Sequence, residues 1–167
     1  MGAEQGTSFL TQVNQNIGIV HRVCRAYFPY DPVEREDAFQ DVMYQLWKSF
    51  SRFQGESKFS TWMYRVALNT VLTRIRRQSF DPRKEELTDA VASLPDVKES
   101  ANREEEVRRL YAAIETLGEV EKAIILLHLD DHDYDEIASI IGITKSNVSV
   151  RLVRIKRALK SCLIGTP

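Results

Sequence analysis

The stretch from Asp133 to Lys160 constrains the fold more than any other, because it has the pattern of two short helices joined by a tight turn. Between Tyr134 and Ile141 the apolar residues recur at intervals of three and four, the spacing of one helix face. Gly142 can adopt the positive φ that ends a helix. In the second helix the apolar stripe consists of Val148, Leu152, Ile155 and Leu159. We therefore predict a helix-turn-helix.

The second helix carries cations away from its apolar stripe, at Lys145, Arg151, Arg154, Lys156, Arg157 and Lys160. A helix that packs its apolar side on a partner and presents basic and small polar groups outward suits the major groove of DNA. The alternative is an ordinary helical hairpin, since a charged helix face is usually only solvated. The rest of the chain has to decide between the two.

Composition argues against a free-standing DNA binder. The chain has 167 residues and a formal net charge of -1, whereas such binders are usually strongly basic. Acidic residues gather between positions 81 and 106, and basic residues between 74 and 84 and between 145 and 160. Local fields of this kind, rather than the total charge, decide where a phosphate backbone can approach.

The two cysteines, Cys24 and Cys162, lie in opposite halves and form no CxxC pattern. We expect both to be small apolar core residues rather than a disulfide pair. No N-terminal run has the pattern of a signal peptide, and no apolar stretch is long enough to span a bilayer. The chain is therefore expected to be cytoplasmic, without membrane insertion.

Helical periodicity is found along most of the chain, and no stretch has the alternation of a strand. Prolines and acidic residues interrupt the periodicity after position 79 and indicate a flexible linker. The expected fold class is all-α, with two small helical domains and a helix-turn-helix in the C-terminal one. The expected boundaries are 8–78 for the first domain, 79–105 for the linker and 106–163 for the second domain.

Two faces in the first domain carry candidate binding residues. The helix expected over 34–50 has an acidic, amide-bearing face, formed by Asp37, Gln40, Asp41, Tyr44 and Lys48. Such a face is usually solvated, but it can also dock against a basic surface. The helix expected over 59–77 has a second face, formed by Trp62, Arg65, Asn69, Thr73 and Arg76. Aromatic and basic groups together suit single-stranded nucleic acid, although aromatics also fill small cores.

The segment from Phe53 to Asn69 resembles the signature F-R-G-x-S-x-F-x-T-W-L-Y-R-I-A-x-N of the extracytoplasmic-function (ECF) sigma factors. The segment Glu36–Asp41 resembles the family's E-D-x-x-Q-E. Tyr134–Ala138 and Val148–Arg154 resemble Y-x-E-I-A and T-V-x-S-R-L-x-R. The matches occur in the right order and cover about residues 10–78 and 106–163. The resemblance implies a bacterial initiation factor that binds core RNA polymerase and promoter DNA.

The resemblance also implies roles for individual residues in the second domain, whose recognition helix would read the minus-thirty-five element as duplex. The candidates for base contacts are Ser146, Ser149, Val150 and Arg154. The candidates for phosphate contacts, which position a helix without specifying sequence, are Lys145, Arg151, Lys156 and Arg157.

The first domain would open and read the minus-ten element. A flipped base costs a few kcal/mol of unstacking, and stacking on an aromatic ring returns about 1–3 kcal/mol. By resemblance, Phe53 and Asn69 would line the base pocket, and the loop that ends at Lys58 would close over it. Trp62, Arg65 and Arg76 would support the strand. Core polymerase would be contacted by Asp37, Gln40, Asp41 and Tyr44.

Two other classes of function were weighed. A stand-alone helix-turn-helix regulator would use the same DNA-reading helix without polymerase. An enzyme is not expected, because no nucleophilic or phosphate-binding constellation is found. His128 and His132 could meet on a helix, but a third metal ligand is not evident, so neither a metal nor a cofactor is expected. An anti-sigma factor, which the family commonly has, is a possible partner.

Overall fold

The computed structural model describes residues 3–80 and 101–165, and within these ranges the chain is helical with no strand. The all-α prediction is confirmed. The elements are α1 (Ala3–Tyr27), α2 (Pro32–Ser49), the 3₁₀ helix η1 (Phe50–Arg52), α3 (Phe59–Ser79), α4 (Ala101–Glu115), α5 (Glu119–Leu129), α6 (Tyr134–Ile141) and α7 (Lys145–Ile164). Most of the predicted linker, 79–105, lies outside the described residues. None of the helices in the described part of the chain is long and apolar enough to cross a membrane.

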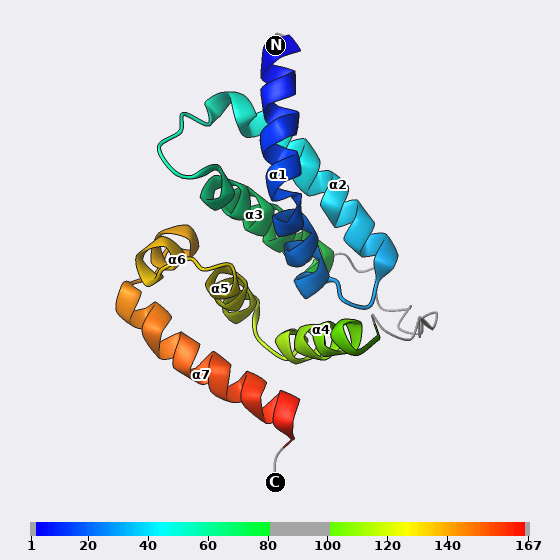
Figure 1. Ribbon diagram of the computed structural model, residues 1–167, viewed down its shortest axis with the longest axis vertical. Helices are drawn as coiled ribbons and strands as arrows, with labels where there is room; N and C mark the ends of the chain where they lie inside the picture. The colour runs from blue at the N-terminus through cyan, green and yellow to red at the C-terminus, as the bar shows by residue number, and fades with distance from the viewer. Residues whose placement is uncertain (1–2, 81–100, 166–167) are drawn as a thin grey trace.

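Helices α1 to α3 form one bundle, here the N-terminal module (Figure 1). Asp31 caps α2 by accepting a hydrogen bond from the Glu34 N–H, and Pro32 occupies the first helical turn, where its missing N–H costs nothing. The buried stripes of α2 and α3 face each other. They consist of Ala38, Val42 and Leu46 from α2, and Met63, Tyr64, Ala67, Leu68 and Val71 from α3.

Helices α4 to α7 form the C-terminal module. Helix α5 lies at its centre, and all six residues from Lys122 to Leu127 are buried. The Lys122 ammonium is paired with the Glu115 carboxylate at 2.8 Å, which compensates for its burial. In α7 the predicted stripe of Val148, Leu152, Ile155 and Leu159 is buried as expected. The helix-turn-helix prediction is therefore correct in its elements and in its packing face.

The cysteine prediction is half right. Cys24 is buried in α1, and burial raises the pKa of its thiol to about 12. Cys162 is exposed, so its expected place in the core is wrong. It continues the stripe of α7 by periodicity, and its Sγ lies 3.9 Å from the Thr116 hydroxyl, but α4 ends at Glu115 and every residue from 160 to 165 is exposed. Periodicity shows which face of a helix is apolar, and it does not show where the neighbouring helices end.

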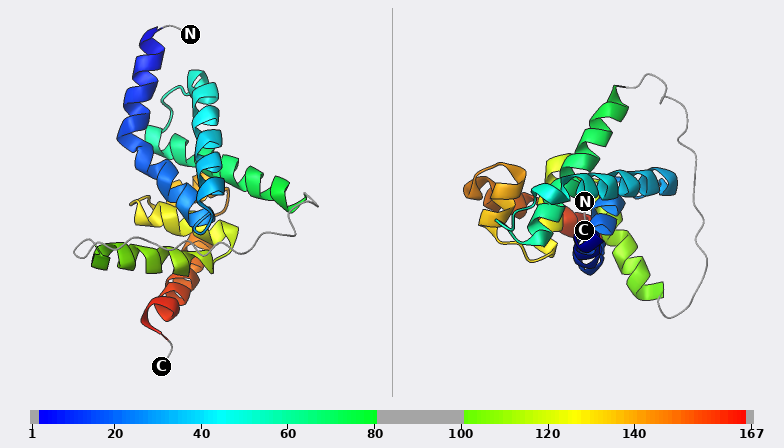
Figure 2. Two further views of the ribbon diagram at one scale, coloured as in Figure 1. Left: turned by 90° about the vertical axis from the view of Figure 1, so that its right-hand side faces the viewer. Right: turned by 90° about the horizontal axis from the view of Figure 1, so that it is seen from above.

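The two modules pack against each other. Helix α1 contacts α4 and α5, and α3 contacts α6, as the views in Figures 1 and 2 show. The Tyr27 hydroxyl donates to the Glu119 carbonyl at 2.6 Å, and the Arg25 guanidinium lies 4.6 Å from the centre of the Tyr111 ring. The sequence analysis did not predict this closed arrangement.

The turn before α6 contains Asp131 at φ 61°, the only described non-glycine residue with positive φ. An L-residue with a Cβ is disfavoured there, although aspartate tolerates it better than most. Replacing Asp131 with glycine should therefore stabilise the chain by about 0.5 kcal/mol, after allowing for the greater entropy of glycine in the unfolded state. Asp131→Ala should instead lower the stability, by about 1 kcal/mol. Chemical denaturation of both variants measures the difference; a destabilised Asp131→Gly would contradict the argument.

Candidate nucleic-acid interface

Local interactions fix the geometry of the helix-turn-helix. The Asp133 side chain accepts from the Glu136 N–H, and the Glu136 side chain accepts from the Asp133 N–H, so the two residues form a capping box. Gly142 ends α6 at φ 81°, a left-handed conformation open to glycine. The Thr144 hydroxyl then accepts from the Asn147 N–H and starts α7. These caps set the angle at which the N-terminal end of α7 leaves the module.

The eight residues predicted for the minus-thirty-five element all lie on α7 outside its buried stripe. Six are exposed, and Ser149 and Arg151 are partly exposed. Lys145 pairs with Asp135 at 2.7 Å, and this hydrogen bond raises the pKa of the Lys145 ammonium. Arg154, Lys156 and Arg157 make no hydrogen bond or ion pair with another described residue. The outer side of α7 is therefore cationic and accessible.

Arg151 is held on both sides. Its guanidinium forms an ion pair with Glu121 of α5, and its Nε–H donates to Asn147 Oδ1 at 2.8 Å. The sequence analysis named Arg151 but not Glu121 or Asn147. Asn147 is exposed in the first turn of α7. This position at the start of the predicted recognition helix could have marked it as a candidate DNA contact. No pattern in the sequence connects Glu121 with α7.

The aromatic residues near the start of α3 lie close together. The Phe53 ring lies 5.5 Å from Phe59 and 5.1 Å from Trp62, centre to centre. All three side chains are partly exposed, and Phe59 and Trp62 also pack at the edge of the core. The cluster therefore contributes to packing and also keeps aromatic surface accessible. This geometry is compatible with both a core role and a nucleic-acid-binding role for the aromatic residues.

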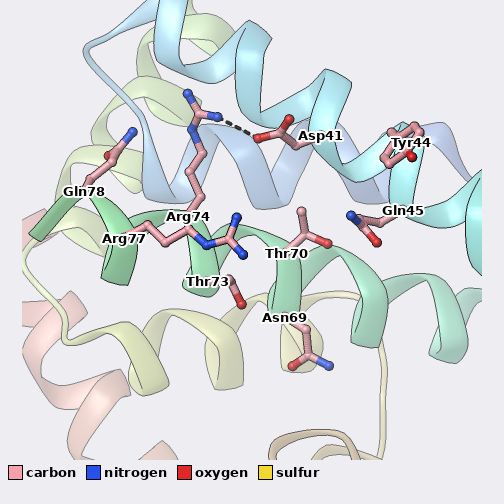
Figure 3. A pocket seen from close by; sticks show the side chains of 9 residues that line it. All are labelled: Asp41, Tyr44, Gln45, Asn69, Thr70, Thr73, Arg74, Arg77 and Gln78. Carbon is pink, nitrogen blue, oxygen red and sulfur yellow. Dashed lines mark hydrogen bonds and ion pairs between the residues drawn. The ribbon is translucent and has the colours of Figure 1, made fainter. Parts of the chain in front are cut away.

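Asn69 lies apart from this cluster. It lines a groove of about 710 Å³ between α2 and α3, together with Asp41, Tyr44, Gln45, Thr70, Thr73, Arg74, Arg77 and Gln78 (Figure 3). Phe53 does not line that groove. Asn69 and Arg76 are both exposed and make no side-chain contact by hydrogen bond or ion pair within the described residues. The structure thus brings Phe53 and Trp62 together, and places Asn69 about two turns further along the same helix.

The predicted polymerase-binding face of α2 is exposed at all four positions, Asp37, Gln40, Asp41 and Tyr44. Its carboxylates converge on one cation from α3. Arg74 lies 2.6 Å from Asp41, 2.9 Å from Glu34 and 3.6 Å from Asp37. The sequence analysis did not single out Arg74, which ties the acidic face of α2 to the helix that carries Asn69.

Asp130, just after α5, is the centre of the contact between the modules. Its carboxylate lies 2.5 Å from the Arg22 guanidinium and accepts a hydrogen bond from the Tyr64 hydroxyl. Burial and this hydrogen bond both raise the pKa of the Tyr64 hydroxyl, so it stays protonated and donates. The His132 ring packs edge-on against Tyr64, with ring centres 5.3 Å apart. The N-terminal and C-terminal modules are therefore joined by specific polar contacts.

Helix α6 also touches two residues predicted to bind the minus-ten strand. Lys58 lies 3.6 Å from the Glu136 carboxylate, and the Arg65 guanidinium donates to the Ser139 hydroxyl at 3.4 Å. Both side chains are on the surface of the N-terminal module that faces α6. In this arrangement they have partners from their own chain.

A metal site has no support within residues 3–80 and 101–165, where no three metal-ligating side chains come together. The His128 ring lies near Tyr134, at 6.3 Å between centres, and desolvation with the nearby Lys156 charge lowers the pKa of His128. His132 is buried against Tyr64 instead. The geometry is that of a two-module helical protein with a helix-turn-helix and a second candidate nucleic-acid surface on α3.

The comparisons identify the class more closely. The family model for Sigma-70 region 2 matches residues 12–80, and the model for Sigma-70 region 4 matches residues 107–159. The ECF RNA polymerase sigma-E factor of Escherichia coli is 31% identical over 152 residues, which cover 83% of this chain and 79% of that protein. This chain belongs to the ECF sigma factors, which direct transcription initiation.

More distant relatives agree in fold. The RNA polymerase sigma-H factor of Pseudomonas aeruginosa is 23% identical over 81% of this chain and 76% of its own length. The sigma factor RpoE from Bartonella quintana, solved with the anti-sigma factor NepR, superposes with a TM-score of 0.76 at 18% identity, over 96% of this chain and 99% of that one. CnrH, solved with the cytosolic domain of CnrY, superposes with a TM-score of 0.66 at 17% identity, over 97% of this chain and 91% of that one.

Proposed function

We propose that this chain binds core RNA polymerase through the acidic face of α2, and reads two promoter elements with its two modules. Helix α7 enters the major groove of the minus-thirty-five duplex, and the exposed face of α3 holds the opened minus-ten strand. The observation that carries the proposal is the placement of all eight upstream candidates outside the buried stripe of one capped helix. Family membership supplies the link to initiation.

The closed arrangement bears on how both elements can be read. The minus-thirty-five and minus-ten elements are named for positions about 25 base pairs apart on the DNA. At about 3.4 Å per base pair this separation is about 85 Å. Helix α6 contacts both α3 and α7, and a helix with its side chains is about 10–12 Å across. Helices α3 and α7 are therefore roughly 20 Å apart where α6 joins them. The modules have to separate before both elements are bound at once.

Two kinds of partner follow from the proposal besides promoter DNA. Core polymerase supplies affinity that a chain with a net charge of -1 lacks. An anti-sigma factor is the second, because RpoE, which has a similar fold, was solved with the anti-sigma factor NepR, and CnrH was solved with the cytosolic domain of CnrY. A partner of that kind would act on this chain by favouring one arrangement of the two modules.

The direct test is run-off transcription by core polymerase and the purified full chain on genomic fragments, followed by mapping of the start sites. A shared pair of upstream sequence elements should emerge from the start sites. Core polymerase alone is the control. If the chain neither joins polymerase nor starts transcription on any fragment, while it protects DNA by itself, the stand-alone regulator becomes the better account.

Arg154 provides a residue-level test of the upstream contact. Its side chain is exposed on α7 and has no hydrogen bond or ion pair within the described residues. If it reads a base, Arg154→Ala should weaken holoenzyme binding by about 1–3 kcal/mol and relax the preference at one position. Binding to a panel of single-base-pair variants measures this. An equal loss on every sequence, with a smaller salt dependence, would make Arg154 a phosphate contact instead.

A further inference from the structure

Near the N-terminal end of α7, two side chains of that helix and one of α5 form a connected group. The Arg151 guanidinium lies between the Glu121 carboxylate and the Asn147 amide, and it donates from Nε to Asn147 Oδ1 at 2.8 Å. Its side chain is only 34% exposed. Glu121 is on α5 and Asn147 on α7, so the contact fixes one helix against the other.

The arrangement determines which way the Asn147 amide points. A guanidinium has donors only, so the atom that faces Arg151 has to be the amide oxygen. The Nδ2 amino group is then the free end of the side chain. It makes no hydrogen bond with another residue in the described part of the chain. The Asn147 N–H is capped by Thr144, which places the residue in the first turn of α7, where helix-turn-helix proteins contact base edges.

We propose that Asn147 reads a base edge of the upstream element as a hydrogen-bond donor, and that Arg151 and Glu121 are positioning residues that hold its amide in that orientation. This inference rests on the proposed function. In the major groove guanine offers acceptors at N7 and O6, thymine at O4 and adenine at N7, whereas cytosine offers only the donor N4–H₂. The contacted base is therefore guanine, thymine or adenine, and cytosine is the base most strongly rejected.

The surroundings of Asn147 suit a base edge better than a phosphate alone. Asn147, Val150, Arg151, Arg154 and Glu121 line one hollow of about 170 Å³. Val150 is 52% exposed and lies one turn beyond Asn147, where its methyl groups can meet a thymine methyl. The Glu121 carboxylate is paired with Arg151, so it neutralises one of the two guanidinium groups at the hollow and weakens the attraction of the hollow for a phosphate. The hollow thus combines an oriented donor with an apolar surface.

The decisive variant is Asn147→Asp in the full chain, assayed as holoenzyme on promoters with every single base-pair change in the upstream element. Arg151 still binds one oxygen of the aspartate, and the outward atom becomes an acceptor. At one position the rejection of cytosine should reverse to a preference for a base with a donor, with cytosine gaining on guanine and thymine by about 5- to 150-fold in relative binding. Asn147→Ala should abolish the preference at that same position.

Glu121 is tested through the same position. Glu121→Ala frees Arg151 and should reduce the discrimination at that base pair. The freed guanidinium can then bind a phosphate, so the slope of log binding constant against log salt concentration should steepen by the equivalent of about one phosphate contact. Glu121→Gln keeps an acceptor for Arg151 and should retain the preference. Glu105→Ala is the matched control, because Glu105 also pairs with arginines but on α4, and it should leave the preference unchanged.

Two results would overturn the inference. Asn147→Asp could keep the wild-type preference at every position, which would make Asn147 at most a phosphate contact. Glu121→Ala could lower the unfolding temperature without changing any base preference, which would reduce the Glu121–Arg151 pair to a stabilising contact. Neither result affects the proposed function, which fails only if the wild-type chain and core polymerase start no transcription.

Discussion

Replacing Asp130 with arginine should separate the two modules. The change removes the ion pair with Arg22, leaves the buried Tyr64 hydroxyl without its acceptor, and places two guanidinium groups together. Because the Arg22 side chain is 41% exposed and the Asp130 side chain 22%, water screens part of this effect. We expect the closed arrangement to lose about 2–4 kcal/mol. Small-angle X-ray scattering should report a larger radius of gyration.

A paired variant distinguishes opening from damage to the fold. Arg22→Asp combined with Asp130→Arg restores opposite charges across the interface and should recover much of the compact form. Glu105→Arg reverses a charge on α4 away from this contact and should leave the radius unchanged. An unchanged radius for Asp130→Arg would show that other contacts, such as that of Tyr27 with the Glu119 carbonyl, are sufficient to keep the modules together.

Opening should also be visible in binding. In the closed form Lys58 and Arg65 contact Glu136 and Ser139 of α6. Asp130→Arg frees both side chains, so the isolated chain should bind a single-stranded minus-ten sequence more tightly than the wild type does. If Lys58 and Arg65 bind the minus-ten strand as proposed, the closed form should lower the affinity of the chain for DNA in the absence of polymerase.

The part of the fold that could be predicted is the part that local sequence determines. The stripe of α7 and the left-handed Gly142 both depend on residues within a few positions of one another. Each was predicted from spacing and residue type. The acidic face of α2 and the basic, aromatic face of α3 were found in the same way.

The contacts that could not be predicted join residues far apart in the sequence. Arg22 and Asp130 are 108 positions apart, and Glu121 and Arg151 are 30 apart. Each residue taken alone has the composition of a solvated surface, and only the packing of α1 on α5 or of α5 on α7 brings the pair together. The predicted burial of Cys162 was wrong for a related reason, because its exposure depends on where the neighbouring helices end. Tertiary packing decided all three.

The largest functional effect is expected from removing both proposed groups of the minus-ten pocket. Phe53→Ala removes a stacking ring, and Asn69→Ala removes an amide, each at a cost of about 1–3 kcal/mol in promoter opening. The double variant should therefore lose about 1–6 kcal/mol, the upper part of this range only if the two costs add, whereas binding to the upstream duplex stays intact. Permanganate reactivity of unpaired thymines measures opening. Asn14→Ala, an exposed amide on α1, is the control and should open promoters normally.

The two single variants decide whether one pocket exists. Phe53 packs with Phe59 and Trp62, and Asn69 lines a different groove with Tyr44 and Gln45. If both groups hold the same flipped base, either loss alone should remove most of the benefit, and the two costs should not add. If the costs add fully, the ring and the amide act on different nucleotides. Unchanged opening in Asn69→Ala would remove that residue from the mechanism and leave the flipped base to the aromatic cluster.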